Sequence, residues 1–181
     1  MRTKTSLLAA LLALSALIVP ALAMAAGNGS DLATVRAATA RFHTFSVAED
    51  AGYGPLHTCT DEESGLGAMG QHYVRGDLVG DTVFDLANPE VLVYEPMPNG
   101  RQRLVAVEFV VFQEPWDAQF GTDPVQPPML FGRELQLVEA PNRYGVPAFY
   151  QIHVWLWKQN PAGIFNDWNE RVSCLGMGDP Q

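Results

Sequence analysis

The spacing of apolar residues near the start of the chain predicts one helix. Apolar side chains recur at helical spacing from Leu32 to Phe45, directly after Ser30 and Asp31, which are typical first residues of a helix. We therefore expect a helix from about residue 30 to residue 50, ended by the glycines and the proline that follow.

Alternating and continuous apolar runs further along the chain predict strands. Asn99-Gly100 between two such runs is typical of a β-hairpin. Glycine-rich residues 58–70 and proline-rich residues 114–131 are expected to be irregular. One helix against a mainly antiparallel sheet is an α+β fold in a single domain. The expected strands are residues 72–74, 91–95, 103–112, 134–138 and 148–157.

Glu108 lies in the middle of the most apolar of these strands. Side chains alternate between the two faces of a strand, and both faces of this strand are apolar, which predicts a central, buried position. A buried carboxylate must find a partner, take up a proton or bind a metal. The expected faces are Val105, Val107, Phe109 and Val111 on one side, and Leu104, Ala106, Glu108, Val110 and Phe112 on the other.

Histidines occupy comparable positions and are the candidate partners of Glu108. His153 lies in the last long strand, on a face shared with Gln151, Trp155 and Trp157, and we expect it to be the first partner of Glu108. His72 begins a strand after the glycine-rich segment. The predicted binding set is completed by His43 on the helix and, in reserve, by Glu95 at the end of the strand before the hairpin; His57 is expected at the surface.

Imidazoles with a carboxylate suit several kinds of chemistry. His43, His72, His153 and Glu108 together would suit a divalent metal such as zinc, copper or iron. The same residues could form a metal-free acid–base pair or a small-molecule pocket, or Glu108 and His153 could form a purely structural pair. No local metal motif such as His-Glu-x-x-His is present. The sequence assigns no catalytic residue and leaves enzymatic activity open.

The N-terminus has the pattern of a secretory signal peptide. A short basic start, a long apolar run and Ala-x-Ala sites predict cleavage between Ala23 and Ala26, leaving residues 26–181 as the mature domain. A retained membrane anchor is the alternative, because the apolar run approaches the length that spans a bilayer. We expect a secreted protein, extracellular or periplasmic, without stable membrane insertion after cleavage.

Charge and cysteine content fit that expectation. Without Arg2 and Lys4 the chain has 9 basic and 20 acidic side chains, a net charge of −11, which argues against nucleic acid as a partner. The two cysteines, Cys59 and Cys174, predict a disulfide in an exported chain. Metal-binding thiolates are the alternative, although neither cysteine has a second ligand at Cys-x-x-Cys spacing.

Several segments together are similar to a family of uncharacterised exported bacterial proteins. The segments are Gly67 to Val74, Leu92 to Pro96, Leu104 to Glu108, and His153 through Asn160-Pro161 to Cys174. The resemblance covers nearly the whole mature chain and implies no activity. The chain departs from the family pattern at Glu170, where the resemblance leads us to expect proline. The functional expectation is an internal His/Glu pocket for a metal ion or small molecule; the alternative is a non-catalytic interaction protein of the envelope or extracellular space.

Overall fold

A computed structural model describes residues 19–62 and 65–177 of the chain. The predicted signal peptide lies largely outside these residues, and its cleavage remains a prediction. Among the described helices, none is both long enough and apolar enough to cross a membrane. The elements are α1 (Val19–Thr39), η1 (Ala40–His43), α2 (Phe45–Asp50), β1 (Gly54–Glu62), β2 (Gly67–Val74), β3 (Val91–Pro96), β4 (Gln102–Phe112), α3 (Gln113–Phe120), β5 (Met129–Leu130), β6 (Arg133–Glu134), β7 (Gln136–Val138), β8 (Phe149–Val154) and η2 (Leu175–Met177).

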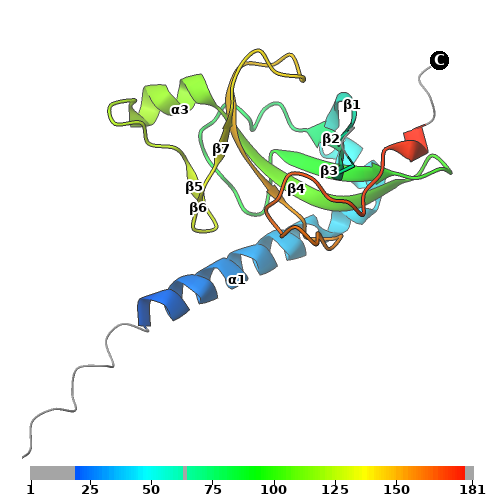
Figure 1. The fold of residues 1–181 in the computed structure, drawn as a ribbon, viewed down its shortest axis with the longest axis horizontal. Helices are drawn as coiled ribbons and strands as arrows, with labels where there is room; N and C mark the ends of the chain where they lie inside the picture. Colours follow the sequence, from blue (N-terminus) through cyan, green and yellow to red (C-terminus); the bar gives the residue numbers. More distant parts are fainter. Residues whose placement is uncertain (1–18, 63–64, 178–181) are drawn as a thin grey trace, which may run out of the picture.

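The fold is α+β, as predicted, and is built on one six-stranded sheet. Its strand order is β1-β2-β3-β4-β8-β7, and every neighbouring pair is antiparallel. Figure 1 shows the sheet strongly curled, with α1 running below it and α3 at one end. The tight turn at Asn99-Gly100 joins β3 to β4, which confirms the predicted hairpin. The most apolar strand, β4, is central and buried, because strands pair with it on both sides.

The two faces of the sheet carry separate cores. The helix face packs against α1, η1 and α2 through side chains such as Phe42, Tyr94 and Phe109. The opposite face, which we call the pocket face, is covered by loops and contains Val91, Val93, Val110, Phe149 and Trp155. Both cores are contiguous clusters of buried apolar side chains, so the sheet is buried on two sides. The predicted site residues on β2, β4 and β8 are therefore shielded from bulk solvent.

A β-bulge in β4 changes the predicted faces of that strand. The register with β3 shifts between Val93 and Tyr94, so that one extra residue is accommodated in β4. Leu104 consequently joins the helix-face core, and Val105 joins Ala106 on the pocket face. The predicted positions of Leu104 and Val105 are therefore wrong, whereas the alternation from Ala106 to Val111 is as expected.

Other element boundaries also differ from the expectation. The helix begins upstream of Ser30, and it is interrupted after Thr39, where η1 and α2 replace a continuous helix. Residues 58–70, expected to be irregular, contain parts of β1 and β2, since glycines are tolerated in this bulged hairpin. Residues 114–131, also expected to be irregular, begin with residues of helix α3. Strand β8 ends at Val154, so Trp157 leaves the strand pattern and packs toward the helix face.

A disulfide fixes the C-terminal segment to the first strand. Cys59 in β1 is bonded to Cys174, 115 residues later, with a Cα–Cα distance of 5.6 Å, which confirms the predicted bond. An isolated bridge between Ala68 and Asn169 holds the same segment against β2. Gly67 allows this contact, because a Cβ at this position would lie 2.1 Å from the Asn169 carbonyl oxygen. Residues 160–174 are thereby held over one end of the pocket face.

Candidate functional site

Three strands bring His72, Glu108 and His153 together on the pocket face. Glu108 of β4 lies directly opposite His153 of β8, and on its other side it lies opposite Val91 of β3. His72 of β2 lies opposite Val93, one position along β3 from Val91 on the same face. The small side chains of β3 leave room for His72 and Glu108 to meet above them. The register of distant strands thus brings the three residues together, which explains why no local sequence motif indicates the site.

The distances within this cluster suit ligands of one ion. The Nε2 atom of His72 lies 3.6 Å from Oε2 of Glu108, and Nδ1 of His153 lies 4.0 Å from Oε1. One ligand atom from each residue can be chosen so that all lie within 4.8 Å of one another. Two ligands bound at about 2.1 Å in tetrahedral geometry lie about 3.4 Å apart, so the ligand atoms would have to move closer together, by up to about 1.4 Å, to share an ion.

The cluster is buried, and its imidazole nitrogens are unpartnered. His153 is fully buried, and His72 and Glu108 are 3% and 4% exposed. None of the four ring nitrogens of His72 and His153 has a hydrogen-bond partner. Each unpaired buried polar group costs about 1–3 kcal/mol, and such groups are rare in native proteins. A cluster with several of them requires an explanation beyond structural pairing.

Burial shifts the protonation of all three residues toward their neutral forms. Burial raises the pKa of Glu108 from 4.5 to about 8, and the nearby carboxylates of Asp167 and Glu90 add to the shift. Burial lowers the pKa of His72 to about 4, while a contact with the Gly70 backbone, short of hydrogen-bonding geometry, acts in the opposite direction. Burial is the main cause of the lowered pKa of His153, and the electrostatic effect of the neighbouring His72 lowers this pKa further. At neutral pH the metal-free cluster therefore carries two neutral imidazoles and a protonated carboxyl group.

Rings and loops around the cluster supply groups that the sequence did not indicate. His153 stacks on Trp155 with ring centroids 4.6 Å apart, which fixes one face of the imidazole. Tyr144, from the loop before β8, places its ring 6.0 Å from that of His72. The pKa of Asp167 is raised by partial burial near the cluster. Tyr144 and Asp167 lie in loops without a periodic pattern, so no sequence signal connected them with Glu108.

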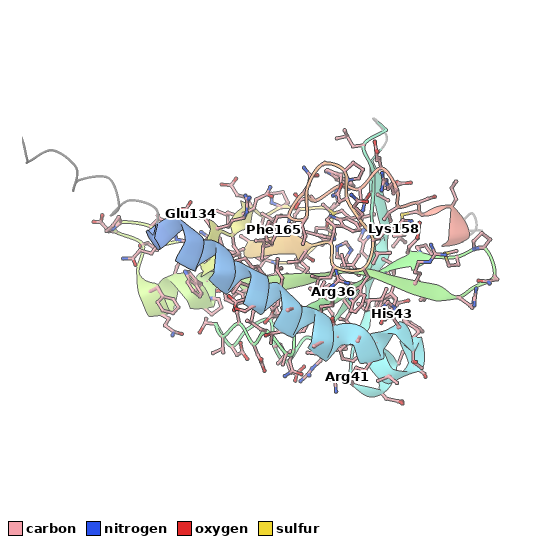
Figure 2. All side chains as sticks on the ribbon, turned by 90° about the horizontal axis from the view of Figure 1, so that it is seen from below. Arg36, Arg41, His43, Glu134, Lys158 and Phe165 are labelled. Atoms are coloured by element: carbon pink, nitrogen blue, oxygen red, sulfur yellow. A yellow bond between two sulfur atoms is a disulfide. The ribbon has the colours of Figure 1, made fainter. Side chains whose placement is uncertain are left out.

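Two of the predicted site residues lie elsewhere. His43 is exposed at the end of η1, where its ring meets Trp157 at 4.4 Å, on the side of the sheet opposite the cluster. Figure 2 shows Arg36 and His43 along the blue-to-cyan helical segments, with His43 nearer their cyan end. Glu95 is held by an ion pair with Lys158, with Nζ 2.7 Å from its carboxylate, and by a second one with Arg103. The expected convergence of all five residues is therefore wrong for these two. His57 is exposed, as predicted.

Glu90 is a second buried carboxyl group, and it has a backbone hydrogen-bond partner. It is 1% exposed, and its Oε2 accepts a hydrogen bond from the backbone N–H of Val110 at 3.1 Å. Strand β3 begins one residue later, so the side chain of Glu90 satisfies a β4 donor that β3 does not reach. Burial raises the pKa of Glu90 to about 8. This satisfied partner distinguishes Glu90 from the cluster histidines.

Comparison with known proteins adds no constraint on the site. No family model matches the chain, and neither the curated proteins nor the solved structures contain a significant match. The family resemblance of the sequence therefore stays a prediction. The functional argument rests on the geometry of His72, Glu108 and His153.

Proposed function

We propose that this protein binds a divalent transition-metal ion through Nε2 of His72, Nδ1 of His153 and the carboxylate of Glu108. The observation that carries the proposal is the convergence of two buried histidines, with unpartnered ring nitrogens, on one buried carboxylate. Two histidines and a carboxylate are the ligands of many zinc sites and of non-haem iron(II) sites. Coordination would supply partners for nitrogens that otherwise have none.

The ligand set leaves room for a further molecule. Three protein ligands leave at least one coordination position of the ion open, as in sites that bind an exogenous molecule. His72 and Glu108 line a cavity on the pocket face, whereas His153 does not. The open position would therefore face the cavity. This arrangement favours an internal pocket over the alternative of an interaction protein with a purely acidic binding surface.

Export is proposed together with the metal site. The disulfide between Cys59 and Cys174 supports an oxidising compartment, where such bonds form and persist. The signal-like N-terminus supports secretion to the periplasm or the medium. Mass spectrometry of the protein from culture medium or periplasm would test the cleavage site; a product that still contained residues 7–21 would contradict the signal peptide.

Metal content is the direct test. Untagged protein, purified from its exported compartment without chelator, is expected to contain close to one equivalent of zinc or iron by elemental analysis. After removal of the metal, titration calorimetry with Zn²⁺ should show one tight site. His72→Ala, His153→Ala and Glu108→Gln should each weaken binding by at least tenfold, because the alanine changes remove a ligand of the ion and glutamine replaces the charged carboxylate by a neutral, weaker ligand.

His43→Ala is the matched control for these variants. His43 is an exposed histidine outside the cluster, so its replacement should leave the zinc affinity unchanged. Circular dichroism would establish that each variant is folded. Equal zinc affinity in the folded wild-type protein and in folded His153→Ala would contradict the proposal.

A further inference from the structure

An apolar cavity opens directly above the metal-ligand cluster. It has a volume of about 180 Å³. Its polar boundary is formed by His72 and Glu108, with Gln151 and Tyr144 beside them. The remaining wall is almost entirely apolar and includes Val74, Val91, Val110, Phe112, Val146 and Phe149.

The size of the cavity limits what it can hold. An engineered apolar cavity of about 150 Å³ in another protein binds benzene. By that comparison, a cavity of 180 Å³ accommodates roughly one six-membered ring with a small substituent. Sugars of more than one ring, peptides and nucleotides are too large to be enclosed.

The distribution of polarity defines the orientation of the occupant. A wholly apolar molecule would leave the open coordination position of the ion held by His72 and Glu108 without a ligand. A wholly polar molecule would have to give up its hydration against valine and phenylalanine side chains, which costs free energy. An occupant with one polar and one apolar end can contact the polar boundary and the apolar wall at the same time.

On the basis of the proposed metal site, we infer that the cavity binds a small, mainly apolar molecule with a single oxygen-bearing head group, such as a phenol or an aromatic acid. The head group lies at the metal ligands His72 and Glu108, and the ring or hydrocarbon part lies against the valines and phenylalanines. The side chain of Gln151, which is buried at the same boundary, offers a donor and an acceptor to the head group.

Two hydroxamic acids of different apolar size provide the test. Benzohydroxamate and acetohydroxamate share the metal-binding group and differ in a phenyl ring against a methyl group. Calorimetric titration of the zinc-loaded protein should show benzohydroxamate bound at least about tenfold more tightly, because its ring buries additional apolar surface. Phenol, added to the metal-free protein and followed by NMR, tests the cavity without the metal.

Cavity-filling variants locate the binding. Gly76 lines the cavity, and a Cβ there meets no heavy atom within 4 Å, so Gly76→Phe is chosen to place a ring at this wall. Gly80→Phe is the matched control, since Gly80 is equally open and does not line the cavity. Val146→Trp fills the cavity from a different wall. The filling variants should abolish the preference for benzohydroxamate and retain bound zinc, and the control should retain both.

The outcomes separate this inference from the metal proposal. Equal affinity for the two hydroxamates in a protein that binds zinc would overturn the inference and leave the metal site intact. Unchanged binding in both Gly76→Phe and Val146→Trp would overturn it as well. If the protein takes up no zinc, while phenol binds and is excluded by Val146→Trp, the metal proposal fails and the small-molecule cavity is supported.

Discussion

The metal-free protein should lose stability as the pH rises from 6.5 to 9, and replacement of Glu108 by glutamine should remove the part of this loss that is due to Glu108. The pKa of Glu108 rises from 4.5 to about 8 on folding, mainly because the carboxyl group is buried. The folded state therefore binds this proton more tightly than the unfolded state. The stabilisation is complete below pH 4.5 and is lost as the pH rises through 8.

The size of this loss follows from the two pKa values. Between pH 6.5 and pH 9, a group that titrates at 4.5 unfolded and at about 8 folded reduces the free energy of unfolding by about 2 kcal/mol. The two buried histidines act in the opposite direction, by about 0.4 kcal/mol each, because they are neutral in the folded state and still about half protonated at pH 6.5 in the unfolded state. Glu90 contributes a similar loss, since its pKa is also raised to about 8.

The comparison of variants isolates Glu108. Urea unfolding, followed by tryptophan fluorescence with a chelator present, would give the free energy of unfolding at pH 6.5 and pH 9. Between these two pH values, the free energy of unfolding of Glu108→Gln should fall by about 2 kcal/mol less than that of the wild-type protein, because glutamine does not titrate. Glu90→Gln is the matched buried control. It should remove the part of the pH-dependent loss that is due to Glu90 and leave the part that is due to Glu108. An identical pH dependence in wild type and Glu108→Gln would refute the buried, protonated state of Glu108.

Further predictions concern the metal, the disulfide and the packing of the C-terminal segment. Zinc binding at pH 7 should release about one proton, from Glu108, as measured by calorimetry in buffers of different ionisation enthalpy; no proton release would contradict its raised pKa. Replacing Cys59 and Cys174 by serine should lower the free energy of unfolding by about 4–5 kcal/mol in chemical denaturation, because the bond closes a loop of 115 residues. Glu95→Gln should weaken the Lys158 ion pair, at a cost of about 1 kcal/mol, and leave zinc affinity unchanged; reduced zinc binding would place Glu95 in the site. Gly67→Ala should lower the melting temperature by several degrees, since its Cβ would clash with backbone and its φ is +92°; an unchanged melting temperature would show that the segment readily shifts.

The sequence predicts the burial of Glu108 correctly because local pattern is enough for that conclusion. A strand that is apolar on both faces has to be central, and a carboxyl group within it has to be enclosed. The same reasoning identifies His153 and, through its strand position, His72. The structure confirms that histidines lie within reach of Glu108 and makes His72 the closer of the two.

The rest of the site could not be predicted, because it depends on long-range placement. His43 shares a helical stripe with core residues, but the helical segments pack on the face of the sheet opposite Glu108. Glu95 finds Lys158, which lies 63 residues away, so no local signal indicated that it was already paired. The bulge that exchanges Leu104 and Val105 is set by the register between β3 and β4, which alternation within one strand does not reveal.

The position of the three proposed ligands on β2, β4 and β8 would link metal uptake to completion of the sheet. His72, Glu108 and His153 lie on three different strands, and β3 separates β2 from β4 in the sheet. At least four strands must therefore pair before the three side chains meet. A chain that is still unfolded would offer at most single histidines to an ion. Metal would therefore be acquired only after the last strands have paired, in the compartment where the protein folds. Because the ion would bind the folded chain alone, a higher metal concentration there would increase the stability of the folded protein.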